Sequence, residues 1–297
     1  MIGTKDDLGH LDAAGRATGA FARRPRLAVY LLVGAGVALS WLIIGAMAVR
    51  GAASRLPGNA APGDGLIGKL PQMPLPDFVE RFFALCMSPA PLGQSGLPEF
   101  AALSAMWFLM AVAMMLPSAA PLVRTYCEIA DTARKKGEPV VHPLVLVAGY
   151  LWVWLAAALG FAALTTALRA VAGGGPLDPL VGAAGAAALA SAGLYQFSGL
   201  KDACLKKCRN PFSILFARWT ARTAGIFRLG AEQGVWCLGC CWALMLVMFS
   251  VGAMNLFWMA LIAMFTLIEK QTSGRFGTRL AGAILLVWAV ALLLISR

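Results

Sequence analysis

Long apolar runs separated by short polar segments dominate the pattern of the chain. A helix of about 20 apolar residues crosses the roughly 30 Å hydrocarbon core of a bilayer. Helices also satisfy their own backbone hydrogen bonds, which lipid cannot do. The pattern therefore predicts an all-α, polytopic membrane helix bundle with about seven transmembrane helices. The expected spans are residues 27–49, 101–123, 140–168, 179–200, 231–251, 256–268 and 280–296.

Two places in this pattern carry strong helix-breaking signals. Pro117 and Pro121 lie near the end of the second span and should kink or terminate it. Met254 and Asn255 mark a turn between the fifth and sixth spans. If residues 231–268 instead form one long tilted helix, the number of spans is six and the last one reverses direction.

The segments between the spans divide the chain further. Residues 201–228 alternate basic and aromatic side chains, which is typical of a helix lying in the headgroup region. Residues 77–87 form a short amphipathic stretch in a Pro- and Gly-rich loop. The predicted divisions are a basic cytoplasmic tail (1–26), the first span with its external loop (27–99), a cysteine-motif membrane domain (100–271) and a C-terminal span (272–297).

Charge adds an orientation to this layout. Only 13% of residues are charged, about half the share of a soluble domain, and the net charge is +11. Under the seven-span layout, 19 of the 25 Lys and Arg residues fall on the side of the N-terminus. Basic loops face the cytoplasm, so the N-terminus is expected inside, in the inner membrane of a bacterium. No basic stretch has the stacking aromatics of a nucleic-acid site, so no nucleic-acid partner is expected.

Seven cysteines are the most informative feature of the composition. Cys204 and Cys208 lie four residues apart. Cys237, Cys240 and Cys241 occupy a five-residue stretch inside the fifth predicted span. Residues three or four apart share one face of a helix. Each group should therefore present its thiols together.

Methionines extend the second group along the same face. Met245 and Met248 follow Cys237 within eleven residues, or about 16 Å of helix rise. Met110 and Met114 form a similar ladder in the second predicted span. Thiolates and thioethers are soft ligands that select Cu(I), zinc or iron–sulfur clusters. The predicted metal ligands are Cys204, Cys208, Cys237, Cys240, Cys241, Met110, Met114, Met245 and Met248, and copper is the expected metal, with zinc and iron as alternatives.

Charged neighbours of these positions give weaker signals. Lys201, Lys206, Lys207 and Arg209 crowd Cys204 and Cys208 in the sequence, and nearby cations favour the thiolate form. Glu269 is expected to be a residue of the membrane interface, with metal ligation as the alternative. Of the two histidines, His10 lies outside the expected spans and His142 lies at the very start of the third, which argues against a bis-histidine haem.

Three motifs carry a resemblance to a known family. They are Trp107-x-x-Met110-x-x-x-Met114-Met115-x-Pro117, Tyr195-Gln196-x-x-x-Leu200-Lys201-x-x-Cys204-x-x-x-Cys208, and Gly234-x-x-Cys237-x-Gly239-Cys240-Cys241-Trp242 with Glu269-Lys270 downstream. Over residues 100–271 the chain resembles the predicted metal-binding integral membrane protein family, catalogued as domain of unknown function 2182. The resemblance implies a bacterial multi-span protein with a metal site at the cysteine motifs. Gln233 stands where that family often has a histidine, which leaves sulfur as the dominant donor.

Three functions follow from these observations. The first is metal handling in the membrane, by binding, delivery or transport of Cu(I), with a metallochaperone as a partner. The second is a membrane oxidoreductase or thiol-redox protein that uses the same cysteines and a membrane redox partner. The third is a structural or assembly subunit in which the cysteines only fill space.

Overall fold

The computed structural model describes residues 25–54, 76–87, 96–172, 182–252 and 255–295, and throughout these segments the regular elements are helices. The prediction of an all-α chain is confirmed. The helices are α2 (Pro25–Ser54), α4 (Asp77–Met87), α5 (Leu97–Met115), the short η3 (Pro117–Ala119), α6 (Ala120–Lys135), α7 (Pro143–Ala172), α8 (Gly182–Tyr195), α9 (Gly199–Arg209), α10 (Pro211–Ala217), α11 (Thr223–Val251), α12 (Leu256–Gln271) and α13 (Phe276–Ile295).

Five of these helices are long and apolar enough to cross a membrane: α2, α5, α7, α11 and α13. The other two expected spans correspond to α8 and α12, which have 14 and 16 residues. Each of the seven apolar runs therefore contains a helix, and five of the helices meet the length of a full span. The side on which the N-terminus lies stays a prediction.

Helix ends follow local chemistry. Helix α5 ends at Met115, and Pro117 and Pro121 begin η3 and the first turn of α6, so the second predicted span is shorter than 101–123. Helix α11 ends where Gly252 adopts a φ of 92°, a conformation that glycine takes without strain. The Asn255 side chain then accepts a hydrogen bond from the Trp258 N–H and caps α12. The turn therefore separates two helices, as predicted; Met254 lies outside the described residues.

The segment 201–228 differs from the single interface helix that its pattern suggested. It holds most of α9, all of α10 and the first residues of α11, which starts at Thr223 rather than near residue 231. Asn210 ends α9 and caps α10 by accepting a hydrogen bond from the Ser213 N–H. The two short helices thus fold against the bundle instead of forming one continuous surface helix.

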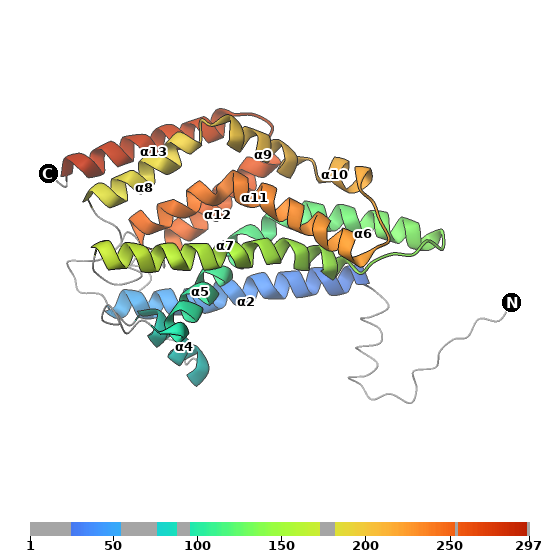
Figure 1. The fold of residues 1–297 in the computed structure, drawn as a ribbon, viewed down its shortest axis with the longest axis horizontal. Helices are drawn as coiled ribbons and strands as arrows, with labels where there is room; N and C mark the ends of the chain where they lie inside the picture. Colours follow the sequence, from blue (N-terminus) through green and yellow to red (C-terminus); the bar gives the residue numbers. More distant parts are fainter. Residues whose placement is uncertain (1–24, 55–75, 88–95, 173–181, 253–254, 296–297) are drawn as a thin grey trace.

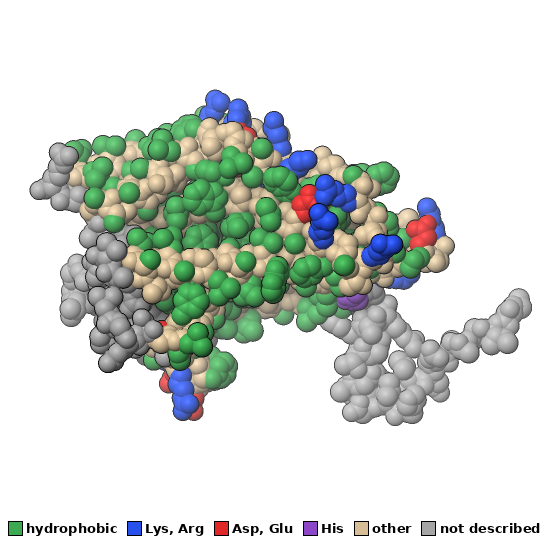
Figure 2. All heavy atoms as spheres, viewed as in Figure 1, with side chains coloured by type: hydrophobic (Ala, Val, Ile, Leu, Met, Phe, Trp, Pro, Cys, Tyr) green, Lys and Arg blue, Asp and Glu red, His purple; other side chains and the backbone are tan. Residues whose placement is uncertain are grey.

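Helix α11 lies at the centre of the bundle. It packs on α7, α8 and α9, while α13 packs on α8 and α5 packs on α2 and α7 (Figure 1). Large apolar side chains cover the flank of the long helices, and Lys and Arg gather at the end of the molecule where α6, α9 and α10 lie (Figure 2). This distribution matches a bundle whose apolar flank faces lipid and whose basic end faces water.

Glycines allow α7 and α11 to approach closely. A Cβ atom placed on Gly230 of α11 would lie 2.0 Å from the Leu146 carbonyl oxygen of α7. A Cβ atom on Gly149 of α7 would lie 2.0 Å from the Phe227 carbonyl oxygen of α11. Small residues are the usual means by which membrane helices pack backbone against backbone. This contact fixes the position of α11, which carries five of the nine predicted metal ligands.

A buried ion pair joins α9 to α12. The Lys201 ammonium lies 2.9 Å from the Glu269 carboxylate, and both side chains are almost fully buried. The same carboxylate accepts a hydrogen bond from the Thr278 hydroxyl of α13, and Arg209 donates to the Glu269 carbonyl oxygen. Glu269 is therefore a buried acid that connects three helices, and its position at the membrane interface stays a prediction.

Removing one member of this pair should destabilise the protein strongly. We expect Lys201→Met to lower the free energy of unfolding by about 3–5 kcal/mol, because it leaves the Glu269 carboxylate buried without its cation. The double variant Lys201→Met/Glu269→Leu should recover much of the loss, since it leaves no unpaired charge. Thermal unfolding of the purified protein in detergent measures both; equal losses in the single and double variants would contradict this account.

Candidate metal centre

The cysteine site forms where α9 crosses α11. On α11, Cys237, Cys240 and Cys241 are buried on one side of the helix, and the thiols of Cys240 and Cys241 both donate to the Cys237 carbonyl oxygen, at 3.1 and 2.9 Å. On α9, Cys208 places its sulfur 3.9 Å from the sulfur of Cys240. The structure thus brings two cysteine motifs that are about 30 residues apart in the sequence into contact.

Cys204 reaches the same place from one turn earlier on α9. Its sulfur lies against the backbone of α11 at Gly239, where a Cβ atom would come within 2.6 Å of it. Gly239 is therefore the residue that lets α9 lie directly on the cysteine segment of α11. The Tyr195 hydroxyl also donates a hydrogen bond to the Gly239 carbonyl oxygen and holds the end of α8 at the same point.

All six described cysteines are free thiols, and Cys208 is the one among them that is only partly buried. Burial raises the pKa of the Cys204 thiol. Contacts with the sulfur atoms of Cys237 and Cys240 hold the pKa of Cys208 well above its ordinary value. The sequence-based expectation that neighbouring cations favour thiolates on α9 is therefore wrong, since Lys201 pairs with Glu269 instead.

The cation beside the thiols comes from α12. The Lys270 ammonium lies 2.9 Å from the Cys237 sulfur and 2.7 Å from the Ser118 hydroxyl. The Tyr150 hydroxyl of α7 lies 3.0 Å from the same sulfur and donates a hydrogen bond to the Met115 carbonyl oxygen. Lys270 belonged to the third sequence motif and Ser118 directly follows the first, but neither had a predicted role; Tyr150 had no sequence signal.

The methionines line the buried interior beyond the thiols. Met245 and Met248 on α11, and Met110 and Met114 on α5, are all at most 1% exposed and belong to the same buried cluster as the cysteines. Helices α5 and α11 also touch through Trp107 and Phe249, whose ring centroids are 5.2 Å apart. Sulfur-bearing side chains therefore continue from the α9–α11 crossing into the bundle.

The thiols are close together without forming a complete coordination sphere. Among the described residues, no three His, Cys, Asp or Glu side chains are arranged as a group that could hold a metal ion. The separation of 3.9 Å between the Cys208 and Cys240 sulfurs does fit a shared metal ion, because sulfurs bound at about 2.3 Å around a trigonal metal lie roughly 4.0 Å apart. The donors present are soft sulfurs, which suit Cu(I) better than harder metals.

The remaining sequence-based candidates lie elsewhere or are not described. Cys127 is buried in α6, where burial raises its pKa to about 11, and its charged neighbours are Arg26, Asp131 and Arg134 rather than other cysteines. The side chain of Cys86 lies outside the described residues. Gln233 is buried one turn before Cys237, and its side-chain oxygen has no hydrogen-bond partner in the described part of the chain.

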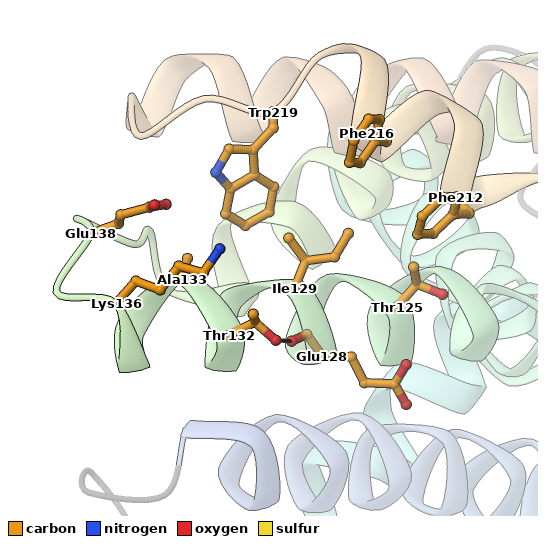
Figure 3. Close-up of a pocket in the computed structure, with 10 residues that line it drawn as sticks. All are labelled: Thr125, Glu128, Ile129, Thr132, Ala133, Lys136, Glu138, Phe212, Phe216 and Trp219. Atoms are coloured by element: carbon orange, nitrogen blue, oxygen red, sulfur yellow. Dashed lines mark hydrogen bonds between the residues drawn. The ribbon is translucent and has the colours of Figure 1, made fainter.

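A separate hollow of about 690 Å³ lies between α6 and α10. Figure 3 shows Trp219 and Ile129 facing each other across it, while the Glu128 carboxylate points away, toward the lower helix. Its lining residues are Thr125, Glu128, Ile129, Thr132, Ala133, Lys136, Glu138, Phe212, Phe216 and Trp219. Because neither cysteine nor methionine is among them, this hollow is distinct from the sulfur site.

The fold and the site together define an all-helical protein with membrane-length helices and a buried thiol cluster. The model of the PpoB2 family, described as a copper chaperone, matches residues 104–292, and the chain belongs to that family. The match contains all nine predicted ligands and extends past the expected boundary at residue 271. No curated protein and no solved structure matches the chain.

Family membership narrows the earlier expectations. The family match indicates a copper-related role rather than metal binding in general. This agrees with copper as the metal expected from the sulfur donors. The resemblance to domain of unknown function 2182 is not tested by this match and stays an expectation, as does each ligand assignment.

Lys270 should tune the affinity of this site. We expect Lys270→Met to weaken Cu(I) binding by roughly tenfold or more, because an ammonium that hydrogen-bonds a sulfur offsets the negative charge of a copper–thiolate group and is worth about 2 kcal/mol. Lys270→Arg should retain most of the affinity, and Lys135→Met, on the exposed end of α6, should change nothing. Anaerobic competition with a chromophoric Cu(I) chelator measures all three; an unchanged affinity in Lys270→Met would exclude this role.

Proposed function

We propose that this protein binds Cu(I) as its cargo at the crossing of α9 and α11 and handles it within the membrane. The observation that carries this proposal is the 3.9 Å contact between the sulfurs of Cys208 and Cys240, beside the buried Cys237 and Cys241. Cys237, Cys240 and Cys241 are the proposed core ligands. Membership in a copper chaperone family supports copper over zinc or iron.

The exposure of the cysteines suggests a direction of transfer. Cys208 is partly exposed, whereas Cys240 and Cys237 lie deeper, at most 2% exposed. Cu(I) would first meet Cys208, with Cys204 beside it, and then move to the α11 thiols by exchange of one sulfur ligand at a time. Met245, Met248, Met110 and Met114 would continue this path as weak, exchangeable ligands.

The proposed setting is the inner membrane of a bacterium. We infer seven spans, with α8 and α12 as the two short ones and the N-terminus in the cytoplasm. The α9–α11 crossing lies toward the basic end of the molecule (Figures 1 and 2), which the positive-inside rule assigns to the cytoplasm. A cytoplasmic metallochaperone is the partner that this orientation favours.

Growth of a deletion strain tests the physiological role. A strain that lacks the protein should change its growth under copper excess or copper starvation, and its cellular copper content should differ from that of the parent. A plasmid copy should restore both, and a copy with Cys208→Ser and Cys240→Ser should not. Unchanged growth and copper content in the deletion strain would contradict the proposal.

The same sulfur contact favours thiol-redox chemistry as the second candidate. Cys208 and Cys240 are near enough to form a disulfide after small side-chain rotations, in which two thiols lose two protons and two electrons to a membrane oxidant such as a quinone. Alkylation of accessible thiols in cells separates the candidates. A redox function requires a fraction of molecules with Cys208 and Cys240 oxidised, whereas copper handling requires both to stay reduced and to be protected by Cu(I).

A further inference from the structure

A second polar site lies at the junction of α8, α9 and α13, and the copper proposal does not use it. It is a hollow of about 360 Å³. Its lining residues are Gln196, Phe197, Asp202, Arg275, Thr278 and Arg279. Gln196 belongs to a sequence motif that the cysteine site leaves unexplained.

Gln196 is the feature that sets this hollow apart from an ordinary surface depression. Its side chain is 2% exposed, and neither its amide nitrogen nor its amide oxygen has a hydrogen-bond partner among the described residues. Burying an amide without partners costs free energy. A polar group bound in the hollow would satisfy it.

The charges around the hollow favour an anion. Arg275 pairs with Asp202 across it, and Arg279 adds a further cation for which the described residues provide no acidic partner. Glu269, behind Thr278, is already neutralised by Lys201. Helices α9 and α13 both begin at this point, so the positive ends of their dipoles lie near it. Arginine forks and helix N-termini together are typical of phosphate recognition.

The surroundings of the hollow indicate where that phosphate comes from. Arg275 and Arg279 flank the start of α13, a helix of membrane-spanning length, so they lie at the level of the lipid headgroups. Phe197 lines the hollow and is 48% exposed, and Leu280 and Ile284 continue an exposed apolar strip along α13. Acyl chains of a lipid could lie on this strip while its headgroup fills the hollow.

We propose that this hollow binds the phosphate of an anionic phospholipid, with Arg279 and the Gln196 amide as its recognition groups and α8 and α13 as the surface for the acyl chains. The bound lipid would hold the loop between α12 and α13 against the start of α9, the helix that carries Cys204 and Cys208. The site is separate from the copper cluster, so its test does not depend on copper binding.

Native mass spectrometry of the full-length protein, titrated in detergent with phosphatidylglycerol or phosphatidylcholine, tests this proposal. We expect phosphatidylglycerol to bind roughly tenfold more tightly. Arg279→Gln and Gln196→Met should each remove most of that preference. Arg81→Gln should keep it; this variant removes an exposed arginine of α4, which lies on the opposite side of the bundle from the start of α13 (Figure 1).

Three outcomes would overturn the proposal. Equal binding of the two lipids would exclude anion recognition. An equal loss of the preference for phosphatidylglycerol in Arg279→Gln and Arg81→Gln would mean that these arginines act only as general charges at the membrane surface. Competition by inorganic phosphate at the same concentration as the lipid would assign the hollow to a free anion. An unfolding temperature in detergent equal to that of the unmodified protein shows that Arg279→Gln is folded, and this control keeps the lipid result independent of the copper proposal.

Discussion

A variant with Cys237→Ser, Cys240→Ser and Cys241→Ser should lose Cu(I) binding by more than about a hundredfold. Changes to groups that only support a metal ligand already cost 10–100-fold in affinity, and this variant removes three of the proposed ligands. Serine keeps the size of the side chain but replaces a soft sulfur with a hard oxygen. The buried packing of α11 should therefore survive while the affinity is lost. Competition with a chromophoric Cu(I) chelator under anaerobic conditions gives the affinity.

The matched control is Cys127→Ser. Cys127 is also buried, but it lies in α6 among Arg26, Asp131 and Arg134 rather than in the thiol cluster. The Cys127→Ser variant should bind Cu(I) with the same affinity as the unmodified protein. If the triple variant retains its affinity for Cu(I), the cysteines of α11 are packing residues. That result would favour the third hypothesis, a structural or assembly subunit. If Cys127→Ser loses as much as the triple variant, the loss reflects general destabilisation.

Gly230→Val should prevent the native packing of α7 on α11. Its Cβ atom would lie 2.0 Å from the Leu146 carbonyl oxygen, so a backbone, and not a flexible side chain, has to move. Overpacking in a core costs about 1–3 kcal/mol, and we expect a loss above the top of that range here. The variant should unfold at a much lower temperature in detergent and bind little Cu(I), since α11 carries the core thiols.

Gly160→Val provides the comparison for this substitution. Gly160 is on α7 as well, but a Cβ atom there has open space around it. Its unfolding temperature should stay close to that of the unmodified protein. Similar unfolding temperatures for Gly230→Val and Gly160→Val would show that α7 and α11 do not meet backbone to backbone.

Much of the helical layout could be predicted because apolar length and helix-breaking residues are local properties. Helix α5 ends at Met115, just before Pro117, which has no N–H to continue it; Pro121 lies in the first turn of α6, and Asn255 caps α12. Residues 201–228 were harder, because their basic and aromatic alternation is compatible with one surface helix or with several packed ones. The break at Asn210 and the contacts of α9 with α11 depend on the tertiary structure.

The site was predictable on each helix and unpredictable between helices. The spacing of Cys237, Cys240 and Cys241 predicted that their thiols share one face of a helix. No local sequence pattern predicted the contact between Cys208 and Cys240. That contact depends on Gly239, which lets Cys204 lie on the backbone of α11. The cation at the thiols was assigned to the wrong helix, because the lysines nearest in sequence are not nearest in space. Lys270 of α12 contacts Cys237, and Lys201 pairs with Glu269.

The most direct test of the central claim is X-ray absorption at the copper edge on purified protein loaded anaerobically with Cu(I). The proposed site predicts near-stoichiometric Cu(I) with sulfur atoms as its nearest neighbours, at a distance of about 2.2–2.3 Å, as is usual for metal–thiolate bonds. A first shell of nitrogen or oxygen, or protein that retains no copper under these conditions, would contradict a copper site at the crossing of α9 and α11.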